Sequence, residues 1–293
     1  MFKIRNIFLL YLLLPIFLCA HKADLVVFSF DRPLQLWALL ESVERNMSNV
    51  GHVVVIYRSS TPEFTRGYDE VELRFESVVF KSQNDKDKID FKPLTKQAIV
   101  EGPSEYVFFA VDDIVVTEQV DLDACIRAME DRDAYGFYLR LGLHLNTCYS
   151  MRKPQSIPAG DVYKDNFFVW CFKDGQFDWN YPHSVDMTVF RKRDIVPQIE
   201  RLRFNSPNTL EGAWSGRAGH VLGKRGVCYI KAPIVNLPLN RVQHDWHNRH
   251  ADLMSSRELL SLFQGGLKLD IEPLQGFVND AAHVEYTPTF EPR

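Results

Sequence analysis

The sequence lacks the signature motifs of several common protein classes. No glycine-rich phosphate loop follows its first predicted strand, which argues against a nucleotidyltransferase. Its five cysteines show no CxxC spacing of the kind that holds structural zinc, and its late histidines have no HExxH frame of a zinc protease. Low-complexity segments and regular repeats are absent too, so we expect neither a disordered chain nor a solenoid.

A surplus of positive charge is also missing. The chain has 34 basic and 38 acidic residues, a formal net charge of −4. A general nucleic-acid-binding protein is expected to be basic overall, so this class is excluded. The balance still allows a local basic pocket for a nucleoside diphosphate. With 46% hydrophobic and 25% charged residues, the chain can build an ordinary globular core.

Long hydrophobic runs are confined to the N-terminus. Lys3 and Arg5 precede the thirteen-residue run Ile7–Cys19, and the small residue Ala20 follows it. This layout is typical of a secretory signal peptide, assigned to residues 1–20. The run is shorter than the ~20 residues that span a bilayer, and a short membrane anchor is the alternative. We therefore predict export into the secretory pathway or periplasm, or membrane association through residues 7–19.

Strand and helix patterns alternate along the first half of the remaining chain. Apolar, β-rich runs predict strands at Asp24–Phe30, His52–Tyr57, Val71–Phe80, Tyr106–Val111 and Ala134–Leu141. The segments between them predict helices at Leu34–Asn46, Pro62–Tyr68, Phe91–Val100 and Asp121–Glu130. This alternation predicts an α/β fold with a Rossmann-like, mostly parallel central sheet and helices on both faces.

The second half is less regular. We expect strands at Phe167–Phe172 and Ser184–Phe190, and helices at Ile195–Leu202, from Thr209 onward and at Ser256–Phe263. No clean linker divides the chain, so residues 21–265 are predicted to form one domain and residues 266–293 an extended C-terminal segment. The cysteines outside the N-terminal run can form one or two disulfides or stay buried thiols: Cys125, Cys148, Cys171 and Cys228.

Two adjacent acids follow the most hydrophobic of the predicted strands. The run Tyr106–Val111 leads directly into Asp112 and Asp113. Carboxylates at the end of a buried strand are costly unless a cation or ligand compensates them. In open α/β sheets, ligands bind at the carboxyl ends of the strands. The sequence therefore predicts a divalent-metal and phosphate site at this turn.

Together these features resemble GT-A-type glycosyltransferases, in particular family-2-like transferases that use nucleotide-diphosphate sugars. The resemblance covers roughly Asp24 to His250. It rests on four stretches in order: Phe28–Pro33 after the first strand, Val111-Asp112-Asp113, Ser184-Val185-Asp186 and Asn208–Glu211. It implies transfer of a sugar to an acceptor hydroxyl on a glycan, lipid or protein. The alternative is an exported, non-catalytic carbohydrate- or partner-binding protein on the same fold.

The resemblance also implies roles for individual residues. The nucleotide-sugar would contact Ser29, Asp31, Arg32, Arg58, Lys92, Asp112 and Arg241. Mn²⁺ or Mg²⁺ would bind Asp113, with Asp112 as a ribose or metal contact and His244 as a further ligand, since hard cations prefer oxygen donors. Ala110 and Val111 precede the acidic pair, so the family's full Asp-x-Asp triplet is absent and a metal-independent site stays open.

Two further acids are candidates for the chemistry itself. An inverting transferase needs a carboxylate that takes the proton from the acceptor hydroxyl. The resemblance places this base near the start of a helix in the second half, where Glu211 lies. Asp186 is the competing candidate, and it could instead bind the donor sugar or the acceptor.

Overall fold

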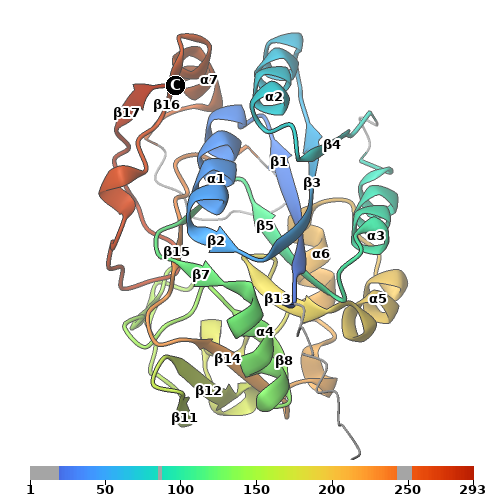
Figure 1. Ribbon diagram of the computed structural model, residues 1–293, viewed down its shortest axis with the longest axis vertical. Helices are drawn as coiled ribbons and strands as arrows, with labels where there is room; N and C mark the ends of the chain where they lie inside the picture. Colours follow the sequence, from blue (N-terminus) through green and yellow to red (C-terminus); the bar gives the residue numbers. More distant parts are fainter. Residues whose placement is uncertain (1–19, 85–87, 243–252) are drawn as a thin grey trace, which may run out of the picture.

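The computed structural model describes residues 20–84, 88–242 and 253–293. The first half alternates strands with helices, as the sequence predicts (Figure 1). Its strands are β1 Ala23–Phe30, β3 Val50–Arg58, β4 Val79–Ser82, β5 Tyr106–Val111 and β8 Ala134–Tyr138. Its helices are α1 Pro33–Asn46, α2 Pro62–Arg74, α3 Phe91–Glu101 and α4 Leu122–Asp131. Prolines at the starts of α1 and α2 fit the first helical turn, where a missing N–H costs nothing.

The second half adds the remaining strands of the main sheet and three helices. The strands are β11 Gly160–Tyr163, β12 Phe167–Cys171, β13 Thr188–Arg191 and β14 Arg225–Tyr229. The helices are α5 Lys192–Arg201, α6 Pro207–Ser215 and α7 Ser256–Gln264. Single-turn 3₁₀ helices are η1 Phe172–Asp174, η2 Phe177–Asn180, η3 Ala218–His220 and η4 Glu272–Leu274.

Short strands pair outside the main sheet. They are β2 Met47–Ser48 with β7 Val120–Asp121, β6 Ile114–Val116 with β15 Ile234–Asn236, β9 Thr147–Cys148 with β10 Lys153–Pro154, and β16 Leu267–Leu269 with β17 Phe290–Pro292. The β6–β15 pair matters most for the site, because it ties the segment after the acidic turn to the late part of the chain.

The main sheet has the strand order β11-β12-β14-β8-β13-β5-β1-β3-β4. β12 and β13 run against the other strands, which are mutually parallel. The predicted fold class is thereby confirmed: a mixed α/β domain with a largely parallel central sheet. β1, β3 and β5 are neighbours, so their carboxyl ends meet at one edge, where polar residues follow buried strands.

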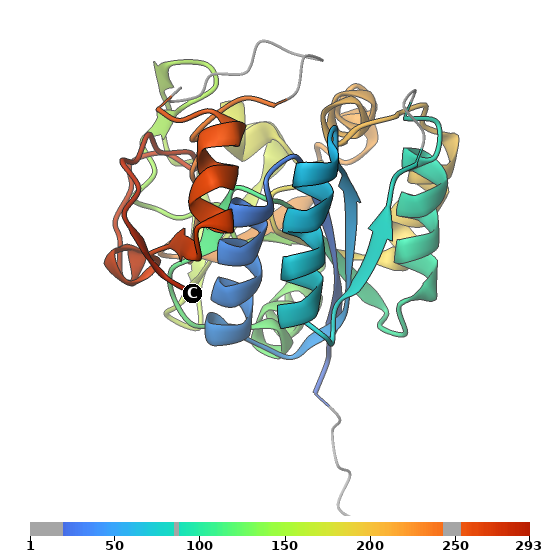
Figure 2. The same ribbon diagram turned by 90° about the horizontal axis from the view of Figure 1, so that it is seen from above.

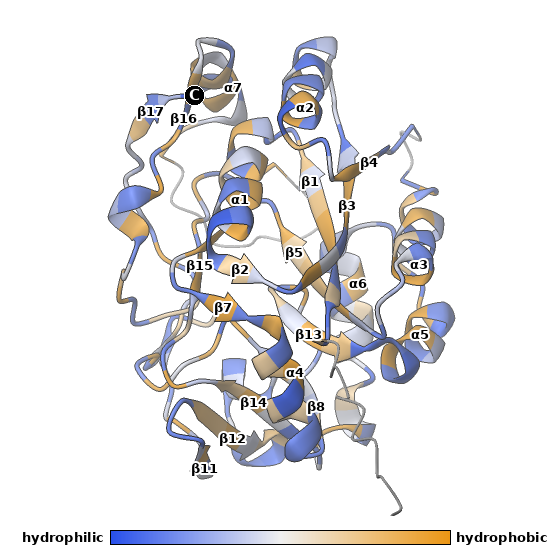
Figure 3. Ribbon diagram, in the orientation of Figure 1, coloured by the Kyte–Doolittle hydropathy of each residue, from blue (hydrophilic) through white to orange (hydrophobic). Residues whose placement is uncertain are grey.

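Alternate residues of the central strands face two different cores. Leu25 and Val27 of β1 join the core that also holds the apolar faces of α1, α2, α4 and α7. Val26 and Phe28 point to the opposite side, where α3, α5 and α6 pack. Figure 2 shows α1, α2 and α7 side by side over one face, and Figure 3 shows hydrophobic colouring concentrated on the central strands. Helices thus cover both faces, as predicted.

The structure corrects three sequence expectations. Val71–Phe80 is not one strand: Val71 belongs to α2, and β4 begins at Val79. Phe64, Tyr68 and Val71 recur at helical spacing and are all buried, so the packing of one helical face outweighs the β-rich composition. The strand expected at Ser184–Phe190 starts only at Thr188, since Met187 before it has φ +46°.

The third correction concerns residues 266–293. They are not a separate extension, because Leu269, Ile271 and Leu274 are buried in the core around α1. The four cysteines named above are free thiols rather than disulfides. The predicted signal or anchor segment and His244 lie outside the described residues. Among the helices that the structure describes, none is long and apolar enough to cross a membrane.

Candidate active site

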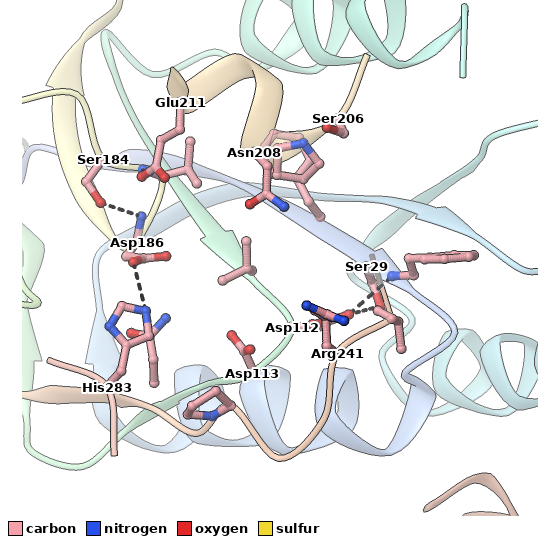
Figure 4. Close-up of a pocket in the computed structure, with 18 of the residues that line it drawn as sticks. Ser29, Asp112, Asp113, Ser184, Asp186, Ser206, Asn208, Glu211, Arg241 and His283 are labelled. Carbon is pink, nitrogen blue, oxygen red and sulfur yellow. Dashed lines mark hydrogen bonds and ion pairs between the residues drawn. The ribbon is translucent and has the colours of Figure 1, made fainter. Parts of the chain in front are cut away.

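A pocket of about 590 Å³ opens at the shared carboxyl edge of β1, β3 and β5. Phe28, Ser29 and Arg58 line it from β1 and β3, and the acidic turn closes its floor after β5. Figure 4 shows Asp112 and Asp113 on one side of this pocket and Asp186 and Glu211 on the other. The four acids singled out from the sequence therefore lie around a single cavity.

Asp112 is held by the turn that follows β1. Its Oδ2 accepts hydrogen bonds from Ser29 Oγ at 2.8 Å and from the Phe30 backbone N–H at 3.2 Å. Its Oδ1 accepts one from Arg32 Nη1 at 2.9 Å. Both carboxylate oxygens thus have partners inside the protein, and only 4% of the residue is exposed. Asp112 and Ser29 both line the pocket, and their mutual hydrogen bond fixes the positions of the two side chains.

Arg32 lines the pocket, as the resemblance implied, but its guanidinium is already engaged by partners within the protein. Its Nη1 lies between the two acids, 2.9 Å from Asp112 and 3.3 Å from Asp113. Its Nε donates to Asn240 Oδ1 at 2.8 Å, and Nη2 donates to the Asn240 carbonyl. The buried guanidinium therefore neutralises the acidic turn and ties it to the segment that follows β15.

One carboxylate oxygen of Asp113 has no hydrogen-bond partner among the described residues. Its Oδ2 faces Arg32, but its buried Oδ1 accepts no hydrogen bond from the described residues. Burial raises the pKa of Asp113 to about 6; Asp112 and Asp186 add to the rise, and Arg32 opposes it. A buried, unpartnered carboxylate oxygen is a suitable ligand for a hard cation.

The residues around Asp113 supply few additional metal donors. No group of three or more His, Cys, Asp or Glu side chains suited to a metal ion exists within residues 20–84, 88–242 and 253–293. Mg²⁺ and Mn²⁺ sites in phosphate-binding enzymes often use one or two carboxylates together with substrate phosphates and water. Asp113 fits that arrangement, with the substrate completing the coordination.

The other nucleotide-binding candidates divide into two groups. Arg58 and Arg241 line the pocket, and the Arg58 guanidinium lies 3.9 Å from the centre of the Phe30 ring. Asp31 lies outside the lining; with φ +53°, it accepts a 2.7 Å hydrogen bond from Ser60 N–H and so holds the turn. Lys92 is also outside, because its Nζ donates to the Leu202 carbonyl at 2.6 Å and caps the end of α5.

Glu211 lies on α6, which a capping box anchors at Ser206 and Thr209. Its Oε1 accepts a 2.9 Å hydrogen bond from the backbone N–H of Val185. Burial raises the pKa of Glu211 to about 7, and the nearby negative charge of Asp186 adds to the rise. A carboxylate that exchanges its proton near neutral pH can act as a general base.

Sequence reasoning missed Arg140, which follows β8. Its Nη1 donates to Asp178 Oδ1 at 2.9 Å, and its side chain is 3% exposed. Although burial opposes it, Arg140 lowers the pKa of Asp178, and Arg140 also limits the rise at Glu211. The Arg140–Asp178 ion pair therefore places a positive charge near Asp186 and Glu211, and neither partner is a buried ion without a counter-charge. The sequence around Arg140 does not indicate that Asp178, 38 residues later, is its partner.

His283 was also missed. Its Nε2 lies 3.7 Å from Asp186 Oδ2, and its ring stacks on Tyr149 with centres 5.7 Å apart. A backbone bridge to Asn236, the last residue of β15, holds it at the pocket wall. Nothing in its local sequence marks it, because this position depends on pairing with a distant strand.

Comparison with known proteins identifies one informative relative. No protein-family model matches the chain. The bifunctional glycosyltransferase pgtA of Dictyostelium discoideum is 28% identical over 214 residues, which is 64% of this chain. The chain is similar to glycosyltransferases. The resemblance to glycosyltransferases inferred from the sequence is thereby confirmed, although the match spans only 27% of the length of that relative.

Solved structures show a more distant likeness. S. aureus TarS 1–349 in complex with UDP has a TM-score of 0.46 and 11% identity, covering 71% of this chain and 57% of that one. The mannosyltransferase PcManGT from Pyrobaculum calidifontis, in complex with GDP-Man and Mn²⁺, has a TM-score of 0.43 and 11% identity, covering 72% and 57%. The fold of this chain is assigned from its own strand order.

Proposed function

We propose that this protein transfers a sugar from a nucleotide-diphosphate donor to an acceptor hydroxyl, with Glu211 as the general base. One observation carries the proposal: a single pocket brings the unpartnered Asp113 oxygen together with a carboxyl whose pKa of about 7 suits proton transfer. The similarity to a glycosyltransferase sequence supports the reaction class. The acceptor is a hydroxyl on a glycan, lipid or protein.

The donor would bind on the β1–β3 side of the pocket. Arg58 and Arg241 line this side and offer planar donors to the diphosphate or the base. Asp113 would hold Mn²⁺ or Mg²⁺ through its Oδ1. Such a cation stabilises the negative charge that develops on the leaving diphosphate. Arg32 keeps Asp113 oriented, since its Nη1 fixes the other carboxylate oxygen.

The acceptor would bind on the α6 side, within reach of Glu211. Glu211 takes the hydroxyl proton as the oxygen attacks the anomeric carbon, and the sugar–phosphate bond breaks with its electron pair going to the diphosphate. Asp186 raises the proton affinity of Glu211 and is the alternative base. We also propose export, or membrane association through residues 7–19, as the sequence pattern predicts.

Nucleotide binding tests the donor site directly. UDP, GDP and their sugars are titrated with and without Mn²⁺ while thermal unfolding is followed. A ligand at a hundred times its dissociation constant raises the unfolding free energy by about 2.7 kcal/mol. We expect the Mn²⁺-dependent part of this increase to disappear in Asp113→Asn, because the replacement removes the anionic oxygen.

Asp161→Asn is the matched control, since the Asp161 side chain is 81% exposed and far along the sheet on β11. It should respond to each nucleotide like the unmodified protein. An equal Mn²⁺ effect in Asp113→Asn would contradict the metal assignment. Glycan binding without any response to nucleotides would favour the non-catalytic binding protein instead. This alternative is tested because Ser29 and Arg32 already occupy the carboxylate oxygens of Asp112.

A further inference from the structure

A closed ring of buried and partly buried hydrogen bonds lies next to the segments that carry Asp186 and Glu211. It joins the side chains of Tyr135, His183, Gln198 and Trp214, together with the Trp214 carbonyl. Trp214 Nε1 is 3.0 Å from Gln198 Oε1, and Gln198 Nε2 is 3.0 Å from Tyr135 Oη. Tyr135 Oη is 3.0 Å from His183 Nε2, and His183 Nδ1 is 2.9 Å from the Trp214 carbonyl. No side chain of the sequence-based site belongs to this ring.

The direction of every bond in the ring follows from its chemistry. A carbonyl only accepts, so His183 Nδ1 carries the hydrogen. An indole N–H only donates, so the oxygen of the Gln198 amide faces Trp214 and its nitrogen faces Tyr135. That nitrogen uses its other hydrogen on the Asp194 carbonyl at 2.7 Å. The Tyr135 hydroxyl therefore accepts from Gln198 and donates to His183.

The ring needs a neutral His183, and its surroundings provide one. Burial lowers the pKa of His183 to about 4, with His220 adding to the effect. Since His183 then has a lone pair on Nε2, it accepts the Tyr135 hydroxyl hydrogen. The His183 ring also stacks on the Trp214 indole, with centres 4.5 Å apart and planes 12° apart. Polar groups and ring faces are thus satisfied together.

The ring connects the elements that carry the two acids. His183 is three residues before Asp186 in the segment leading to β13, and Trp214 is three residues after Glu211 on α6. Residues three apart on a helix lie on neighbouring positions, so a shift of Trp214 moves Glu211 with it. Tyr135 and Gln198 add anchors on β8 and α5. Four separate elements are therefore locked around the acid pair.

We propose that this ring is a positioning device that fixes the separation of Asp186 and Glu211 and thereby sets the pH at which Glu211 exchanges its proton. This inference rests on the proposed role of Glu211 as base. The groups that face Glu211 are Asp186, Arg140 and Tyr181, together with Ser184 and the Val185 N–H. A loosened ring lets Asp186 move away and water enter, and both changes stabilise the ionised form of Glu211.

Tyr135→Phe tests the proposal because it removes one hydroxyl and breaks two bonds of the ring. We expect the acidic midpoint of the pH profile for sugar transfer to fall by about half a unit or more, since Glu211 ionises more easily. The donor KM should change little, because Tyr135 does not line the pocket. Tyr229→Phe is the control: it removes a buried hydroxyl that contacts Cys125 Sγ at 3.2 Å, near α4, and should leave the midpoint unchanged.

A second readout does not require activity. The pH dependence of unfolding, compared with that in a Glu211→Gln background, reports the Glu211 proton directly. Tyr135→Phe should shift this dependence toward acid as well. If Tyr135→Phe folds poorly, His183→Asn is used instead, because it keeps a donor for the Trp214 carbonyl but loses Nε2. The pH dependence of its unfolding must then also shift toward acid. Unchanged midpoints in both folded variants would overturn the ring proposal, whereas a protein that turns over no nucleotide sugar, yet shows the unfolding shift, would overturn only the proposed function.

Discussion

Glu211→Gln is expected to reduce sugar transfer by about 10²- to 10⁴-fold, the usual contribution of a general base. The same variant should be more stable than the unmodified protein at pH 8. The folded-state pKa of Glu211 is about 7 against an ordinary value of 4.5, so the folded protein binds this proton more tightly than the unfolded chain does. Stability from this group therefore falls as pH rises from about 4.5 to 7.

Glutamine cannot ionise, so the variant avoids that loss. We expect an advantage of about 3 kcal/mol in unfolding free energy at pH 8 and almost none near pH 4.5, measured by denaturant unfolding. Glu200→Gln, at an exposed position on α5, is the control and should change neither quantity. Undiminished transfer by Glu211→Gln would move the base to Asp186. A stability difference that does not vary with pH would contradict the raised pKa.

Arg32→Met is expected to lower the unfolding free energy by about 3–5 kcal/mol at neutral pH. The variant keeps much of the side-chain volume but removes the charge that compensates Asp112 and Asp113. It also breaks both contacts with Asn240. Protonation of Asp113, whose pKa is raised by burial to about 6, relieves the repulsion between the two uncompensated buried carboxylates. The loss should therefore be smaller at pH 5 than at pH 8. Denaturant unfolding at the two pH values measures this.

Two further variants sharpen the Arg32 prediction. Arg66→Met removes an arginine whose ion pair with Glu63 is on the surface of α2, and it should cost less than about 1 kcal/mol. Arg32→Met combined with Asp112→Asn should recover part of the lost stability, because the pair is coupled. A loss below about 1 kcal/mol in the single variant would show that Arg32 does not neutralise the acidic turn.

Much of the fold could be predicted because its core strands have strong local patterns. β1, β3, β5 and β8 each contain an apolar run next to polar residues, and their sequence alone indicates buried strands. The error at Val71 arose from composition: β-branched and aromatic residues favoured a strand, whereas the helical spacing of Phe64, Tyr68 and Val71 favoured the helix that forms.

The candidate site was only partly predictable, for a physical reason. The acidic turn and Glu211 follow recognisable local elements, so their place at the pocket could be expected. The partner of a charged side chain, however, is decided by tertiary structure. Arg32 resembles a phosphate-binding residue in sequence, yet its nearest anions are Asp112 and Asp113. Lys92 caps α5 for the same reason, and His283 reaches the pocket through one backbone bridge.

The bridge between Asn236 and His283 has a consequence for the order of folding. Domains begin to fold while the chain is synthesised, and β1, α1 and β3 can pair from local contacts early. His283 lies between β16 and β17, and it takes its place in the pocket wall only when this segment docks against β15. Because this contact joins distant parts of the chain, it should form late. During refolding, the sheet should therefore recover before the pocket can retain a nucleotide.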